Sequence, residues 1–180
     1  NFGEMSFTSD TIWSFAVFSS ALIVALTSPI MGAIADRTKI KMLMLRIFTY
    51  VGAGATLLMG GALIFGLGIK WIWLLAMFIL ANVGLNGAGV FYNAILPHLG
   101  DDDEIDEISN TAYAYGYLGG GILLVIHLAL LLATSYADWA IAFSLSTSGI
   151  WWYGFALITF KNLKEPEIKN PVDDLTFSSA

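Results

Sequence analysis

Charged residues divide the chain into five long apolar runs. No Asp, Glu, Lys or Arg occurs within these runs, which cover residues 11–35, 47–69, 71–100, 108–137 and 139–160. Roughly 20 apolar residues in a helix cross the hydrocarbon core, so each run can span a bilayer once and none can span it twice. The runs lack the alternation of barrel strands. Because lipid requires internally satisfied backbone, the pattern predicts an all-α membrane protein with five transmembrane helices.

The composition agrees with a chain surrounded by lipid. Hydrophobic residues make up 57% of the 180 positions and charged residues 12%, against about 25% charged residues in a soluble domain. The net charge of −6 offers no basic footprint for nucleic acid, and the absence of cysteine excludes disulfides and thiolate metal sites. We therefore expect the lipid bilayer as a partner, with no nucleic acid, cofactor or bound metal.

An acidic segment, residues 101–107, follows the third run and contains six carboxylates. It lacks the alternating ligand spacing and the central glycine of an EF-hand. We expect a solvated loop whose carboxylates favour the start of the next helix, because a negative charge is stabilised at a helix N-terminus.

Basic residues are distributed unevenly over the connections between the runs. With five crossings, the first connection and the tail lie on the same side of the membrane. Seven of the eight basic residues lie on that side: Arg37, Lys39, Lys41, Arg46, Lys161, Lys164 and Lys169. Only Lys70 lies on the opposite side. The positive-inside rule then places the N-terminus outside and the tail in the cytoplasm, for a multi-pass protein of the plasma membrane.

Both ends of the chain suggest further sequence beyond them. Residue 1 is Asn, no signal peptide is present, and an outside N-terminus implies an upstream helix. Residues 161–180 are polar and contain Pro166 and Pro171, as is typical of a linker. We expect a partial transmembrane bundle over residues 1–160, with its first helix missing, and the start of a central cytoplasmic linker over residues 161–180.

The first connection carries a patterned group of charges. The segment from residue 32 to residue 41 resembles the signature loop of the major facilitator superfamily, and four positions match it: Gly32, Asp36, Arg37 and Lys41. Lys39 and Ile40 stand where the family usually has Gly and a basic residue. A small residue lets helices approach closely, and the basic residues can meet carboxylates or lipid phosphates. The resemblance implies a cytoplasmic gating loop, and an ordinary basic loop that only sets topology is the alternative.

A second resemblance is more specific and extends over residues 10 to 160. The segment 91–97, Phe-Tyr-Asn-Ala-Ile-Leu-Pro, is followed by the acidic segment, by Ile108-Ser109 and by the segment 114–121, Ala-Tyr-Gly-Tyr-Leu-Gly-Gly-Gly. This order is similar to the vacuole-effluxer-like branch of the superfamily. The resemblance implies that the five helices are the second to sixth of twelve, and that the missing C-terminal half of the same chain completes the bundle.

The same resemblance implies a function. A member of this branch would be a secondary active transporter that moves a small-molecule substrate, with amino acids as the implied class, by alternating access about a midplane site. A coupling proton or cation would be a further partner. A sugar–cation symporter of a related branch is the competing interpretation.

Side-chain amides form a stripe on the third predicted helix. At about 100° per residue, Asn82, Asn86, Gly89 and Asn93 fall within about 60° of one another. Amides that face lipid are costly, so we expect the stripe to face a wet cavity and to point away from the second and fifth predicted helices. The resemblance implies that this helix lines the substrate path, which includes Tyr92. The alternative is interhelical bonding, worth about 0.6 kcal/mol on average.

The fourth predicted helix carries a similar stripe with Tyr113, Tyr117 and His127. Tyr adds a hydrogen-bond donor on an apolar body, and the resemblance implies that this helix borders the partner half. An ionisable residue at membrane depth is a functional candidate, so His127 either serves a coupling proton or forms a neutral bond to a neighbouring helix. Gly116 and Gly120, four residues apart, predict close helix packing.

Two further classes of function have less support. An intramembrane enzyme would need a constellation of acids and histidines within the helices. None of the five runs contains an acid, and His98 and His127 are far apart in the sequence, so we expect no enzyme. A non-transporting membrane scaffold is not excluded, but a polar stripe through its bundle would be unexpected.

Overall fold

The computed structural model describes residues 9–37, 39–65 and 67–167. Its elements, in chain order, are α1 (Ser9–Arg37), α2 (Lys41–Met59), η1 (Gly60–Ile64), α3 (Leu67–Ile95), η2 (Leu96–His98), α4 (Asp102–Ala133) and α5 (Asp138–Asn162). The five long helices are each long and apolar enough to cross a membrane. The predicted all-α class with five transmembrane helices is confirmed.

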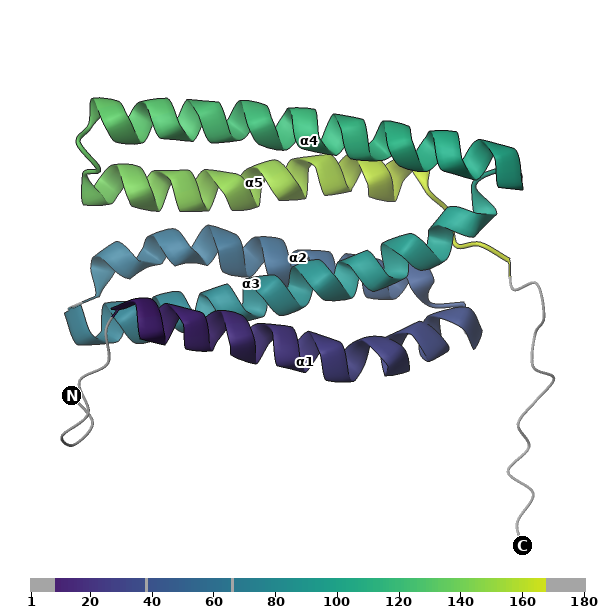
Figure 1. Cartoon of the computed structure of the whole chain (residues 1–180), viewed down its shortest axis with the longest axis horizontal. Coiled ribbons are helices and arrows are strands. Elements are labelled where there is room, and N and C mark those ends of the chain that lie inside the picture. The colour runs from purple at the N-terminus through teal and green to yellow at the C-terminus, as the bar shows by residue number, and fades with distance from the viewer. Residues whose placement is uncertain (1–8, 38, 66, 168–180) are drawn as a thin grey trace, which may run out of the picture.

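The five helices run back and forth side by side (Figure 1). Helix α3 packs against both α1 and α2, and α2 also packs against α5. Helix α4 contacts α5 and the short η2, and it is exposed along nearly its whole length. The bundle is therefore compact around α2 and open around α4.

Two apolar clusters lie between the packed helices. The larger one joins the end of α1, the start of α2 and the end of α3, and consists of Ala35, Met42, Leu45, Ala88, Phe91 and Ile95. The smaller one lies towards the other end of α2 and consists of Ala55, Met59 and Ala81. Lipid tails are as apolar as these side chains, so close packing rather than burial from water must hold the helices together.

Glycines allow that close packing at particular positions along α2. A Cβ atom added to Gly84 of α3 would overlap the backbone of Gly52, and one added to Gly149 of α5 would lie 2.7 Å from the carbonyl oxygen of Ala53. Ser146 Oγ also donates a hydrogen bond to the carbonyl oxygen of Leu57 at 3.0 Å. Helix α2 is therefore in backbone contact with α3 on one side and with α5 on another.

Other glycines do not pack. Around Gly116 and Gly120 of α4, and around Gly32 of α1, no described atom comes within 4 Å of an added Cβ. Close packing at Gly116 and Gly120 is therefore not seen among the described residues, and packing against the rest of the transporter stays a prediction. The spacing of small residues shows where another helix could approach closely. Close packing also requires that a second helix lies on that face.

Several helix boundaries differ from the prediction, and α3 begins at Leu67, inside the second predicted run. Helix α2 begins at Lys41 rather than near residue 47, and the acidic segment is not a loop because α4 begins at Asp102. The backbone N–H of Asp101 donates to Glu104 Oε2 at 3.2 Å, as in a capping box. Charged residues end a transmembrane span, but they do not end a helix, and carboxylates in the first turn stabilise its N-terminus.

Candidate functional site

A cavity of about 770 Å³ lies between α3 and α4. Its lining comes from Leu85, Gly89, Tyr92, Asn93 and Leu96 on one side and from Ser109, Ala112, Tyr113, Gly116 and Tyr117 on the other. The lining combines one amide, three phenols and one hydroxyl with small and apolar side chains. Such groups can position a polar molecule through neutral hydrogen bonds.

The structure brings four of the predicted path residues together at this cavity: Tyr92, Asn93, Tyr113 and Tyr117. Helices α3 and α4 run in opposite directions, so the end of α3 lies beside the first half of α4 (Figure 1). This antiparallel arrangement explains why Asn93 and Tyr113 reach the same space although the acidic segment separates them in the sequence.

The rest of the amide stripe lies farther along α3. Asn82 is half-buried and Asn86 is exposed. Asn86 Nδ2 donates to the backbone carbonyl oxygen of Asn82 at 2.8 Å, and Asn82 Nδ2 donates to that of Phe78 at 3.5 Å. Both hydrogen bonds lie within α3, so neither of them joins α3 to another helix.

The direction of the stripe follows from the packed face of α3. The buried side of α3 contains Ala81, Gly84, Ala88 and Phe91, and Gly84 meets the backbone of α2. At about 100° per residue, the mean direction of Asn82, Asn86 and Asn93 is roughly opposite to that side. The stripe therefore points away from α2. Its role in binding a substrate stays a prediction.

His127 does not line the cavity, and its ring contacts α5 instead. His127 Nε2 lies 2.9 Å from Thr147 Oγ1, and that hydroxyl donates to the carbonyl oxygen of Phe143 at 2.7 Å. A hydroxyl has only one hydrogen, so Thr147 accepts from His127 Nε2 when it donates to Phe143. This geometry matches the interhelical alternative, and a role in proton coupling stays a prediction.

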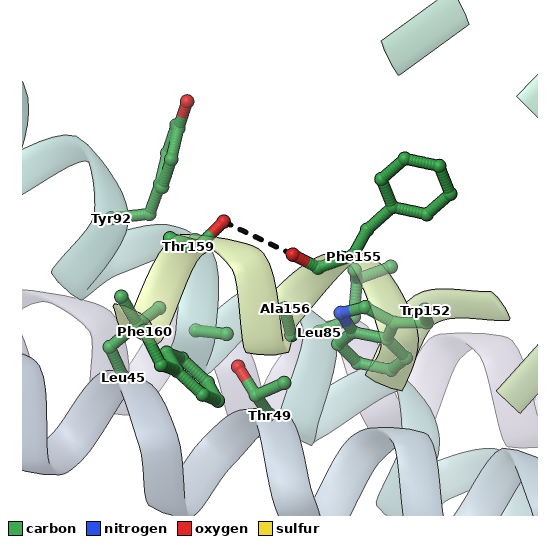
Figure 2. A pocket seen from close by; sticks show the side chains of 11 residues that line it. Leu45, Thr49, Leu85, Tyr92, Trp152, Phe155, Ala156, Thr159 and Phe160 are labelled. Atoms are coloured by element: carbon green, nitrogen blue, oxygen red, sulfur yellow. Dashed lines mark hydrogen bonds between the residues drawn. The ribbon is translucent and has the colours of Figure 1, made fainter. Parts of the chain in front are cut away.

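A second, smaller pocket of about 280 Å³ lies between α2, α3 and α5 (Figure 2). Its lining is almost entirely apolar and includes Thr49, Trp152, Phe155 and Phe160. Figure 2 shows Tyr92 at its edge, and Tyr92, Leu85 and Gly89 line both pockets. No sequence pattern predicted this pocket, because its aromatic residues come from two separate runs: Tyr92 lies in the third run, and Trp152, Phe155 and Phe160 lie in the fifth.

The residues of the signature-like loop lie at the end of α1 and the start of α2. Arg37 is exposed in the last turn of α1, while the side chain of Asp36 lies outside the described residues. Gly32 faces open space among the described atoms, so close helix approach there is not observed. Of the motif's charges, that of Arg37 is exposed in the described bundle.

Lys41, which we expected in an exposed cytoplasmic loop, is buried. Only 5% of this residue is exposed. Its Nζ lies 3.3 Å from the carbonyl oxygen of Ala94 and 3.1 Å from His98 Nε2, so it donates to the end of α3. The long apolar stem of Lys41 lets its ammonium turn inward to the last carbonyl groups of α3, while its backbone N–H binds the Glu165 carboxylate. A role of Lys41 in gating stays a prediction.

Two residues at this end were not predicted as partners. Glu165, just after α5, binds the first backbone amides of α2, and His98 accepts a hydrogen bond from Lys41. No sequence signal could have identified Glu165, since it lies more than a hundred residues from its partners. In the described part of the chain, no three His, Asp or Glu side chains come together as metal ligands.

Comparison with known proteins places the chain in a family. A family model described as "Vacuole effluxer Atg22 like" matches residues 2–177. The "Uncharacterized MFS-type transporter YxiO" of Bacillus subtilis (strain 168) is 25% identical over 167 residues, which are 86% of this chain and 38% of that protein. No solved structure matches significantly. The chain spans well under half of this relative's length, and it belongs to the Atg22-like vacuole effluxer family of the major facilitator superfamily, a family of multi-pass membrane transporters.

Proposed function

We propose that this chain forms five helices of the N-terminal bundle of a secondary active transporter, and that the cavity between α3 and α4 is part of the substrate path. The observation that carries the proposal is the gathering of Tyr92, Asn93, Tyr113 and Tyr117 around a space of about 770 Å³. Amides and phenols both donate and accept hydrogen bonds, so they can bind the polar groups of a small metabolite without a fixed charge.

An amino acid is the substrate class that we infer from the resemblance to vacuole effluxers. The described lining of the cavity contains neutral polar groups, which can bond the carboxylate and ammonium groups of a zwitterion and equally the hydroxyls of a sugar. The second half of the transporter would close the path from the other side, as alternating access about a midplane site requires two halves. Residues 161–180 would then contain the end of α5, at Asn162, and the start of the linker between the halves. Residues 168–180 lie outside the described residues.

The proposal includes an orientation that cysteine labelling tests directly. The chain contains no cysteine, so single cysteines give unambiguous signals. Cysteines at Thr38 and Asn170 should react with an impermeant thiol reagent only from the cytoplasmic side, and one at Ala137 only from outside, because the basic connections stay in the cytoplasm. Labelling of positions 38 and 137 from the same side would contradict five crossings.

Transport by the full-length protein in proteoliposomes tests the path. With a panel of amino acids, sugars and other small metabolites, Asn86→Ala and Asn93→Ala should each raise the KM of the transported substrate about 3- to 10-fold, since a net hydrogen bond contributes about 0.5–1.5 kcal/mol. Protein yield should change little. Asn162→Ala is the matched control, because Asn162 bonds to its own helix at the end of α5.

The same assay separates the competing interpretations. Cation-dependent uptake of a sugar would favour a symporter of the related branch, and a pH gradient that drives uptake would identify a coupling proton. If no member of the panel is transported and none raises the melting temperature of the protein, a scaffold function gains support. If a substrate moves and both Asn variants keep the original KM, the transporter proposal stands and the amide stripe is excluded from its path.

A further inference from the structure

At the end of the bundle where α1 passes into α2, a carboxylate from beyond α5 binds the start of α2. Glu165 Oε1 accepts a hydrogen bond from the backbone N–H of Lys41 at 2.8 Å, and Oε2 accepts one from that of Met42 at 2.8 Å. These are the first two residues of α2. The first four N–H groups of a helix have no partner within it, so Glu165 satisfies donors that α2 cannot satisfy itself.

A second contact joins the same two helix ends, this time from a side chain of α2 to the end of α5. Arg46 Nη2 donates to the backbone carbonyl oxygen of Phe160 at 3.4 Å, and the guanidinium carbon lies 5.6 Å from the centre of the Phe160 ring. Phe160 belongs to the last turn of α5, which ends at Asn162. The last carbonyl groups of a helix lack intrahelical partners, and a cation is favoured beside them.

The two contacts together have complementary charges. Helices α2 and α5 run in opposite directions, so the positive end of α2 and the negative end of α5 lie at the same end of the bundle (Figure 1). A carboxylate that follows α5 binds the positive end of α2, and a guanidinium of α2 binds the negative end of α5. Each helix is therefore capped by a charge from the other.

Lys41 extends this arrangement to α3. Its buried ammonium donates to the carbonyl oxygen of Ala94 and to His98 Nε2. An ammonium group can only donate, so His98 accepts and carries its own proton on Nδ1. The same residue whose backbone N–H binds Glu165 thus ties the start of α2 to the end of α3.

We propose that Glu165 and Arg46 form a cross-cap that locks the ends of α2 and α5 together, and that Lys41 joins the end of α3 to it. The cross-cap makes these three helix ends one rigid unit when the bundle moves. It also fixes the direction in which the chain leaves α5, because residues 163–165 must return to the start of α2. The inference concerns the fold of this bundle and does not depend on the substrate path.

Hydrogen–deuterium exchange of the full-length protein in detergent tests the cross-cap at its two amides. Electron-transfer fragmentation of a peptide around residues 40–46 resolves the N–H groups of Lys41 and Met42. Both should be protected in the unmodified protein, although neither has a partner within α2. In Glu165→Ala both should exchange at least tenfold faster, because no other acceptor replaces the carboxylate.

Glu167→Ala is the matched control, because Glu167 is exposed and lies two residues farther along the same segment. It removes the same charge and should leave both amides protected. Should Glu165→Ala yield no folded protein, Glu165→Gln keeps one carbonyl oxygen and should deprotect one of the two amides. The proposal is overturned if the amides exchange freely in the unmodified protein, or if the Glu165 variants exchange no faster than the Glu167 control.

Discussion

Replacing Gly84 by valine should destabilise the bundle more than a substitution at most other positions. A Cβ atom at Gly84 would overlap the backbone of Gly52 and would lie 2.8 Å from the carbonyl oxygen of Phe48. Backbone atoms cannot turn aside as a side chain can, so α2 and α3 would have to separate. Overpacking typically costs about 1–3 kcal/mol, and we expect a cost at or above the upper end of that range.

The measurement is the melting temperature of the purified full-length protein, followed by size-exclusion chromatography after heating. A loss of about 3 kcal/mol corresponds to a fall of about 6–12 °C in a domain of this size. Gly54→Val is the control on α2, because no described atom lies within 4 Å of its added Cβ. Both changes replace glycine by a β-branched residue within a helix, so their difference isolates the packing cost. Equal melting temperatures would show that α2 and α3 do not meet at Gly84.

Replacing Gly116 by tryptophan should abolish transport and leave the fold intact. Gly116 lines the cavity between α3 and α4, and no described atom lies within 4 Å of its added Cβ. An indole at this position enters the cavity without displacing the backbone. If substrate passes beside Tyr113 and Asn93, we expect the transport rate to fall at least tenfold, while the melting temperature stays within about 2 °C, as for a surface substitution below about 0.5 kcal/mol.

Gly121→Trp provides the control on the same helix. Gly121 also faces open space but does not line the cavity, and about 140° of helix rotation separates it from Gly116. This variant should transport at the normal rate. Normal transport by Gly116→Trp would contradict a path through this cavity, whereas equal loss in both variants would indicate that bulk anywhere on α4 blocks its contact with the rest of the transporter.

The hydrophobic pattern was sufficient to predict the fold class and the number of helices. A segment that crosses lipid must satisfy its own backbone and must exclude charge, so the five charge-free runs mark the five spans whatever their neighbours are. The helix starts at Lys41 and Asp102 were missed for the same reason. The lipid constraint ends at the membrane surface, and beyond it capping and local propensity decide where a helix begins.

Because α3 is one continuous helix from Leu67 to Ile95, Asn82, Asn86 and Asn93 share one face of it. Which space that face meets depends on where α4 lies, and the sequence does not contain that information in any local pattern. The same holds for the glycines, since Gly84 packs against a backbone while Gly116 faces a cavity. A helical repeat determines directions within one helix, and only the crossing of helices determines neighbours.

The charged residues at the end of the bundle show the limit most clearly. The sequence by itself predicts a side of the membrane for Lys41 and Arg46, because basic residues are retained on the cytoplasmic side whatever their later partners are. Only the tertiary structure decided that Lys41 turns to His98 and that Glu165 caps α2. Contacts between residues more than a hundred positions apart arise when antiparallel helices bring opposite ends of their dipoles together, and this geometry exists only in the folded bundle.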